Sequence, residues 1–235
     1  MRPSNLAMVT GASKGIGAAV ARTLSEHGFA VLLIARDAQA LSQVAGYIQA
    51  EGGTAFAVAA DLSRPEQADD VLRAVRQTGL ELKIVVHNAG MARVAPVAQM
   101  ALKDWEDLIR LNLTAPFVLT QKLLPLLRYG SQIVFINSIG GRQAFPEWSA
   151  YCASKFGLRA FADSLREEVK ERGIRVTSIF PGAVDTPLHD DQPYDWDRAK
   201  MMKPADVAAA VLYCAQQPPN IRINEIELES SSGRF

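Results

Sequence analysis

The most informative turn of this chain reads Thr10-Gly11-Ala12-Ser13-Lys14-Gly15-Ile16-Gly17. It follows an apolar run of strand length at 6–9 and leads directly into a segment of helical periodicity near 15–27. Glycines let the backbone turn tightly and approach a pyrophosphate, and the free N–H groups and dipole of the new helix favour its negative charge. Glycine-rich turns also form for purely steric reasons, so the position between strand and helix carries the prediction of a dinucleotide site.

Outward from this turn, apolar runs of strand length alternate with segments of helical length. The further runs cover 30–34, 55–59, 84–86, 133–136, 176–180 and 226–228, and the helical segments lie near 38–50, 65–77, 102–128, 149–172 and 204–216. Near-continuous apolar strands separated by helices indicate a parallel sheet covered on both faces. We therefore expect one doubly wound, Rossmann-type α/β domain over residues 1–235, with about seven strands.

The composition favours a small-molecule ligand over a nucleic acid or a membrane. Of the 235 residues 49% are hydrophobic, and 25 basic residues cancel 25 acidic ones, so no net charge attracts an anionic polymer or surface. No apolar run approaches the roughly 18–20 residues of a membrane span, and the first residues lack the apolar segment of a secretory signal. We expect a cytoplasmic protein without a metal site, in which Cys152 and Cys214 form no disulfide framework.

A phenol and an ammonium lie four residues apart at Tyr151 and Lys155, in a segment with helical periodicity. Residues at i and i+4 share a helix face, with Cβ atoms about 5–6 Å apart. A tyrosine with its usual pKa of roughly 10 is a poor base until a nearby cation stabilises the phenolate, and Lys155 is placed to supply that cation. Taken alone, the pair would be ordinary helix-surface residues, and Ser138 at the end of the fifth apolar run would be an ordinary strand-end hydroxyl.

Together, these elements resemble those of the short-chain dehydrogenase/reductase family over nearly the whole chain. The T-G-x-x-x-G-x-G turn, Asp61, Asn88-Ala89-Gly90, Asn112, Ser138, Tyr151-x-x-x-Lys155 and Pro181-Gly182 leading to Thr186 follow the family's order. The resemblance implies an enzyme with the catalytic residues Asn112, Ser138, Tyr151 and Lys155. We expect cofactor contacts from Gly11, Ser13, Lys14, Gly15, Ile16, Gly17, Arg36, Asp61, Leu62, Asn88, Ala89, Gly90, Tyr151, Lys155, Pro181, Gly182, Val184 and Thr186.

The end of the second apolar run indicates which nicotinamide cofactor binds. NAD sites of this type place an acidic residue there, to accept from the ribose 2′-hydroxyl. This chain has Leu33-Ile34-Ala35-Arg36 instead, and the planar guanidinium of Arg36 matches a phosphate. Lys14 in the glycine turn adds a second cation. We therefore predict NADP(H), although Asp37 next to Arg36 complicates this assignment.

Asn112 can also be interpreted from local physics. Pro116 lies four residues later, has no N–H, and so leaves the Asn112 carbonyl without its helical donor. The resemblance implies that this carbonyl holds a water that relays protons to Lys155. The alternative is that Pro116 simply kinks a long helix, with a water filling the gap.

The resemblance implies a reaction in which Ser138 orients a carbonyl oxygen and Tyr151 protonates it as hydride arrives, while Lys155 lowers the pKa of Tyr151 and holds the nicotinamide ribose. The predicted function is therefore NADP(H)-dependent interconversion of a ketone or aldehyde and an alcohol. A reductase of a carrier-bound 3-oxoacyl chain is an alternative, for which Arg93, Arg142 and Lys200 are suggestive. A non-catalytic NADP-binding regulatory protein is a further alternative, and the intact catalytic set argues against it.

The segment at about 182–203 is long, irregular and rich in Asp, Pro and aromatic residues, so we expect it to cover the substrate. Its acidic residues are expected to form a solvated loop. Apolar and aromatic residues at five positions are expected to line a substrate pocket: Met91, Phe145, Trp148, Tyr194 and Trp196. The alternating residues 222–229 predict an outer strand, a region that often joins subunits in the family, so a homodimer or homotetramer is expected.

Overall fold

A computed structural model describes residues 3–190 and 192–232 of the chain. Residue 191 of the predicted covering segment and the ends of the predicted 1–235 domain lie outside the described residues. The described chain forms one parallel sheet of seven strands in the order β3-β2-β1-β4-β5-β6-β7. The strands are β1 (Asn5–Thr10), β2 (Ala30–Ala35), β3 (Ala55–Ala59), β4 (Glu81–His87), β5 (Gln132–Ile136), β6 (Arg175–Pro181) and β7 (Glu225–Leu228). The predicted fold class and the outer position of the last strand are confirmed.

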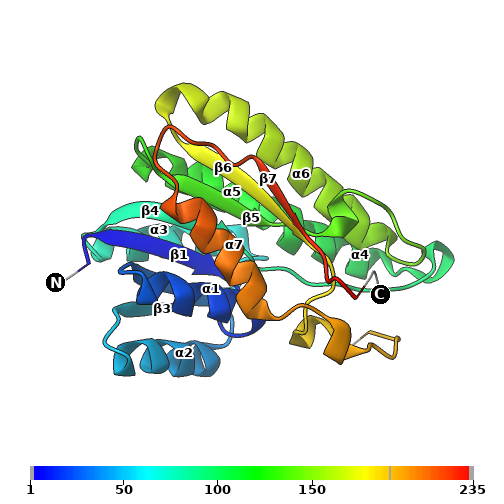
Figure 1. Cartoon of the computed structure of the whole chain (residues 1–235). Coiled ribbons are helices and arrows are strands. Elements are labelled where there is room, and N and C mark those ends of the chain that lie inside the picture. Colours follow the sequence, from blue (N-terminus) through cyan, green and yellow to red (C-terminus); the bar gives the residue numbers. More distant parts are fainter. Residues whose placement is uncertain (1–2, 191, 233–235) are drawn as a thin grey trace.

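Helices cover both faces of this sheet (Figure 1). On one face, α1 (Gly15–Glu26), α2 (Ala38–Ala50) and α7 (Pro204–Gln216) share an apolar core with the strands. On the other, α3 (Ala68–Gln77), α5 (Ala115–Leu123) and α6 (Ser149–Val169) pack in a second core, and α4 (Leu102–Ile109) contacts α6. The central strands are buried on both faces, which explains why they are continuous apolar runs rather than alternating ones.

The strand order places a crevice at one edge of the sheet. From β1 the chain proceeds outward to β2 and β3, then returns to β4 on the other side of β1. The loops that leave β1 and β4 therefore diverge, and a doubly wound sheet binds its ligands at the carboxyl ends of the strands where this reversal occurs. The glycine turn follows β1, and Asn88 follows β4, so the fold brings these two predicted motifs together.

The predicted long helix at 102–128 is interrupted in its middle. Between α4 and α5, Arg110–Thr114 form a π-helical turn, in which the N–H of Ala115 donates to the carbonyl of Arg110. Pro116 follows at the start of α5, where its missing N–H removes the donor that an α-helix would direct at Asn112. The interruption thus has a local cause in the sequence, and it places the Asn112 side chain toward α6.

In the part of the chain that the structure describes, no helix is both long enough and apolar enough to cross a membrane.

Candidate active site

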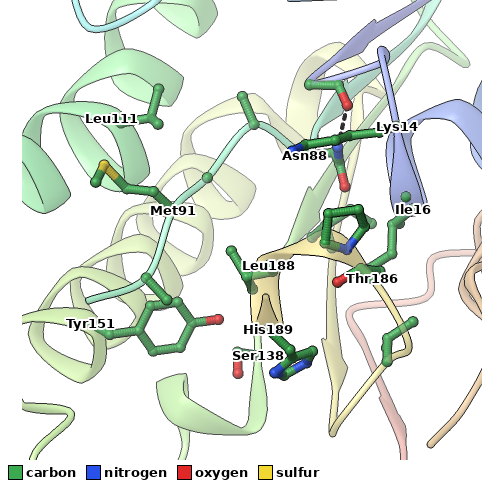
Figure 2. A pocket seen from close by; sticks show the side chains of 18 of the residues that line it. Lys14, Ile16, Asn88, Met91, Leu111, Ser138, Tyr151, Thr186, Leu188 and His189 are labelled. Carbon is green, nitrogen blue, oxygen red and sulfur yellow. Dashed lines mark hydrogen bonds between the residues drawn. The ribbon is translucent and has the colours of Figure 1, made fainter. Parts of the chain in front are cut away.

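A cavity of about 970 Å³ opens at the carboxyl ends of the strands. Nearly all of the predicted site residues line it, from Arg36 and Lys14 at one end to Tyr151 and Lys155 at the other. Gly17 and Asn112 do not line the cavity, but each contacts a residue that does: Gly17 packs against Gly11, and Asn112 hydrogen-bonds to Met91. Further lining residues not predicted from sequence include Ala35, Ser63, Ile139, Gly140, Leu188 and His189. Figure 2 shows Lys14, Asn88, Ser138, Tyr151 and Thr186 around this common space.

The glycine turn is held too tightly for side chains. Gly11 has φ +64°, which favours glycine, and a Cβ built on Gly17 would lie 2.3 Å from the carbonyl oxygen of Gly11. Gly17 is therefore needed for the close approach of α1 to the turn. The same packing leaves the first N–H groups of α1 facing the cavity end where a pyrophosphate is predicted.

Thr10 joins the glycine turn to the end of β4. Its buried Oγ1 accepts hydrogen bonds from the N–H groups of Asn88 and Ala89, both at 2.9 Å. The Asn88 side-chain nitrogen donates in return to the carbonyl of Thr10, also at 2.9 Å. Sequence reasoning missed Thr10 as a functional residue, although a hydroxyl at the last position of an apolar strand was the available signal.

At the far end of the cavity, the exposed Arg36 and Lys14 form no ion pair with the described residues. Asp37 lines the cavity beside Arg36, and one oxygen of its carboxylate caps α2 by accepting from the N–H of Ala40 at 3.0 Å. Burial raises the pKa of Asp61, but hydrogen bonds from Ser63 and the nearby charges of Arg36 and Arg64 lower it overall.

The three predicted reacting groups lie together at the other end. Tyr151 is in the first turn of α6, as predicted. Ser138 follows β5 by two residues and caps a short 3-10 turn, where its hydroxyl accepts from the N–H of Gly140 at 3.0 Å. Lys155 is buried, and its Nζ donates to the carbonyl of Ile136 at 3.0 Å and lies 5.7 Å from the centre of the Tyr151 ring. Figure 2 shows the Tyr151 hydroxyl pointing into the cavity.

The pKa of Tyr151 differs from the sequence prediction. Burial raises the pKa of Tyr151 to about 12, and a hydrogen bond with Ser138 acts in the opposite direction without outweighing it. Burial also lowers the pKa of Lys155 to about 8. The expected net lowering of the Tyr151 pKa is therefore absent, because removal of the phenol from water is the larger effect; that Lys155 stabilises the phenolate stays a prediction. At neutral pH, Tyr151 is therefore a phenol that can donate a proton.

Two amides hold α6 against the sheet edge. The side chain of Asn112 accepts from the N–H of Met91 and donates to its carbonyl, both at 2.9 Å, and it also donates to Ser154 Oγ at 3.0 Å. Asn137 donates to the carbonyl of Lys155 at 3.2 Å. Neither Ser154 nor Asn137 was identified from the sequence. Both fix the helix that carries Tyr151, so they position the reacting groups.

Comparison with known proteins identifies the family. The sequence profile described as short chain dehydrogenase matches residues 5–195. The chain belongs to the short-chain dehydrogenase/reductase family. Among its relatives, an uncharacterized oxidoreductase of Staphylococcus saprophyticus is 33% identical over 94% of this chain and 95% of its own length. A bovine (Bos taurus) dehydrogenase/reductase, SDR family member 11, is 34% identical over 95% of this chain and 94% of its own.

Solved structures of other short-chain dehydrogenases match this chain closely. A metagenomic short-chain oxidoreductase in complex with NADP has a TM-score of 0.86 at 32% identity, with 98% of each chain covered. The alcohol dehydrogenase of the archaeon Thermococcus sibiricus, complexed with 5-hydroxy-NADP, has a TM-score of 0.91 at 27% identity, also with 98% of each chain covered. The predictions that the chain belongs to this family and that it is an oxidoreductase are thus confirmed.

In this short-chain dehydrogenase, four of the five residues predicted for the substrate pocket line the cavity: Met91, Phe145, Trp148 and Trp196. The prediction was wrong for Tyr194. Its ring instead packs behind the cavity wall against Trp148 and Trp196, and its hydroxyl donates to Glu147 at 2.7 Å. Leu188 and His189 line the cavity from the covering segment, which Figure 2 shows opposite Tyr151.

The cations considered for a carrier-bound substrate do not gather at the cavity. Of the three cations Arg93, Arg142 and Lys200, only Arg93 lines the cavity. Arg142 forms ion pairs with Glu225 and Glu227 on β7, at 2.5 and 3.2 Å, and Lys200 pairs with Asp197. The pattern that would favour a carrier-bound acyl chain is therefore absent among the described residues.

The expected covering segment is anchored at both of its ends. Val184 forms a parallel bridge with Met202, and Thr186 lies over the glycine turn, where a Cβ on Gly15 would meet its methyl group at 3.3 Å. Arg198 pairs with Asp185 and Asp190. Most acidic residues of the segment are thus matched by cations, and the described residues contain no cluster of potential metal ligands.

Proposed function

We propose that this short-chain dehydrogenase is an NADP(H)-dependent oxidoreductase that interconverts a ketone or aldehyde and an alcohol. The observation that carries the proposal is one continuous cavity with two unpaired cations at one end and a protonated phenol beside a hydroxyl at the other. The nearby structures support the cofactor, because several are complexes with NADP or NADPH at 26–32% identity. Their cofactor is a property of those proteins that we carry over here.

The residues fit NADP(H) on local grounds. The turn at Gly11 and Gly17 excludes side chains and leaves room for a pyrophosphate at the start of α1. Arg36 and Lys14 supply cations for the 2′-phosphate, and Asp61 and Leu62 lie beside the expected adenine position. Pro181, Gly182, Val184 and Thr186 line the opposite wall, next to the expected nicotinamide.

In the reductive direction, the bound cofactor supplies a hydride to the carbonyl carbon. Ser138 and Tyr151 hydrogen-bond the carbonyl oxygen and keep it near the hydride path. As negative charge develops on that oxygen, Tyr151 transfers its phenolic proton to it, so that the carbonyl becomes an alcohol. The Lys155 ammonium stabilises the phenolate that remains, and its donation to Ile136 fixes its position.

Reprotonation of Tyr151 then needs a path. In an α-helix the carbonyl of Asn112 would accept from the N–H of residue 116, but Pro116 has none. This carbonyl is therefore available to hold a water between solvent and Lys155. The Asn112 side chain keeps this turn fixed to Met91 and Ser154. We include this relay, and a homo-oligomer, in the proposal.

The test is a panel of ketones and aldehydes with NADPH, followed by the loss of absorbance of the reduced nicotinamide. The wild type should reduce members of the panel, and Tyr151→Phe should lower kcat by at least about 100-fold while NADPH affinity stays within a few-fold. Fluorescence titration of NADPH checks the second point. A Tyr151→Phe variant as active as the wild type would contradict the assignment of the proton donor.

A further inference from the structure

The substrate end of the cavity is bounded by rings that contact one another. Trp148, directly before α6, lines the cavity and packs edge-on against the catalytic Tyr151, with ring centres 5.4 Å apart at 73°. Tyr194 of the covering segment is stacked on Trp148 at 6.3 Å and 10°, and Trp196 meets Trp148 edge-on at 6.5 Å. Trp196 also lines the cavity. The rings therefore continue from the reacting group into the covering segment.

One residue ties these walls together. Glu147 has φ 69°, a left-handed conformation that is uncommon for a residue other than glycine. Its carbonyl accepts from the N–H of Ala95 at 3.0 Å, and its carboxylate accepts from the Tyr194 hydroxyl at 2.7 Å. Glu147, which directly precedes Trp148, thus bonds to both the loop after β4 and the covering segment. These contacts fix the chain directly before Trp148, whose indole packs against Tyr151 and Tyr194.

Apart from Lys155, whose Nζ donates to the carbonyl of Ile136, the charged side chains at this end are few and none of them is buried. Lys103 and Asp107 are paired with each other. Arg93 is exposed and donates to the carbonyl of Ala92, so its attraction for an anion is weakened by water and salt. Met91, Phe145 and Leu188 complete an apolar lining. An uncharged apolar group loses the least hydration free energy on entering such a space.

We propose that the substrate carries a flat, uncharged apolar group, an aromatic ring above all, and that Trp148 selects it. This inference rests on the proposed function, since it names the class of carbonyl that Tyr151 protonates. A ring next to an indole gains an edge-to-face or offset stacked contact in addition to its buried area, which a puckered saturated ring does not. Trp148 is placed to provide that contact, because it lines the cavity and its ring packs against both Tyr151 and Tyr194.

The test compares matched methyl ketones. Benzylacetone and its ring-saturated analogue have the same unconjugated carbonyl, so they differ in the shape of the ring and hardly in reactivity, while levulinate carries a carboxylate. We expect kcat/KM for benzylacetone to exceed that of the saturated analogue by about three- to tenfold, with levulinate lowest. Trp148→Leu should reduce this ratio toward one and Trp148→Phe should keep most of it.

The chain provides a matched control in Trp105→Leu. Trp105 lies on α4, is partly exposed and does not line the cavity, so the ring preference should persist in this variant. A preference for levulinate or the saturated ketone, or a ring preference that survives Trp148→Leu, would overturn the inference. Circular dichroism confirms that each variant is folded.

Failure of the inference can be distinguished from failure of the proposed function. If the wild type binds NADPH but reduces none of these ketones, the proposed function fails in this form. Calorimetry then measures how tightly benzylacetone and its saturated analogue bind to the NADPH complex, which tests whether the pocket prefers the aromatic ring. Tighter binding of benzylacetone that is lost in Trp148→Leu supports the inference, and equal binding or no binding overturns it.

Discussion

At the nucleotide end of the cavity the glycine turn is shaped by close backbone contacts, whereas the substrate end is bounded by aromatic and other apolar side chains. The turn after β1 meets the end of β4 through two side chains bonded to main-chain groups, the hydroxyl of Thr10 and the amide of Asn88. The substrate wall depends on apolar side chains from three separate loops, represented by Met91, Trp148 and Trp196. A backbone-built site tolerates little change at its glycines, while a side-chain wall can be exchanged without loss of the fold. The two ends should therefore respond differently to substitution.

The largest expected effect is at Gly17. A Cβ there would lie 2.3 Å from the Gly11 carbonyl oxygen and 2.5 Å from the Asn88 side-chain nitrogen, so Gly17→Ala must displace the turn. We expect loss of measurable NADPH binding and a lower midpoint of thermal unfolding. The matched control is Gly46→Ala on α2, where an added Cβ meets nothing within 4 Å, and which should stabilise the fold by about 0.5–1 kcal/mol. Calorimetry and thermal unfolding measure both. Undiminished NADPH affinity in Gly17→Ala would contradict the backbone-built site.

This contrast also explains what the sequence could predict. The glycine turn and the apolar runs depend on local backbone geometry, so the strands, the crevice and most nucleotide-side residues follow from the sequence alone. The position of Tyr194 could not be predicted in this way, because the direction of a side chain in a loop is decided by partners that are distant in the sequence, here Glu147. The pKa of Tyr151 was misjudged for a related reason. Spacing places Lys155 near the phenol, but spacing does not reveal how far both are removed from water.

The next effect is a pH dependence of stability at the reacting groups. Burial lowers the pKa of Lys155 from its usual 10.5 to about 8, so between these values the unfolded chain binds a proton that the folded chain does not. Stability should therefore rise with pH across this window, by on the order of 3 kcal/mol for this residue. Burial raises the pKa of Tyr151 from 10.0 to about 12, and its contribution is lost as pH rises through that range.

Urea unfolding of cofactor-free protein at a series of pH values checks this. Lys155→Met should remove the rise between about pH 8 and 10.5 and leave the fall above pH 10, whereas Tyr151→Phe should do the reverse. Each variant is thus the control for the other. If the difference in stability between wild type and Lys155→Met did not change with pH, the lysine would not be as buried as the structure places it.

A moderate effect is expected at the cation for the 2′-phosphate. Arg36→Ser removes a guanidinium that forms no ion pair in the described chain, so its loss should weaken NADPH binding by about ten- to 100-fold and leave NADH binding nearly unchanged. Arg64→Ser is the control, because Arg64 is exposed, lies near Asp61 and does not line the cavity. Separate titrations of both cofactors measure the ratio. Equal weakening of NADH and NADPH would mean that Arg36 does not recognise a 2′-phosphate.

The smallest effect should appear at the tie between Tyr194 and Glu147. Tyr194→Phe keeps the ring packing on Trp148 but removes the hydroxyl that donates to Glu147, an exposed hydrogen bond worth about 1 kcal/mol or less. We expect KM for a ketone substrate to rise about two- to threefold with kcat unchanged or slightly higher, because a looser covering segment weakens substrate binding and eases product release. Glu147→Ala, which removes the acceptor, should have a similar effect, and the double variant should add little, since both changes break the same contact. Tyr213→Phe, on the exposed face of α7, should change neither constant. If the effects of Tyr194→Phe and Glu147→Ala were additive, the two residues would act separately and the tie would not constrain the wall.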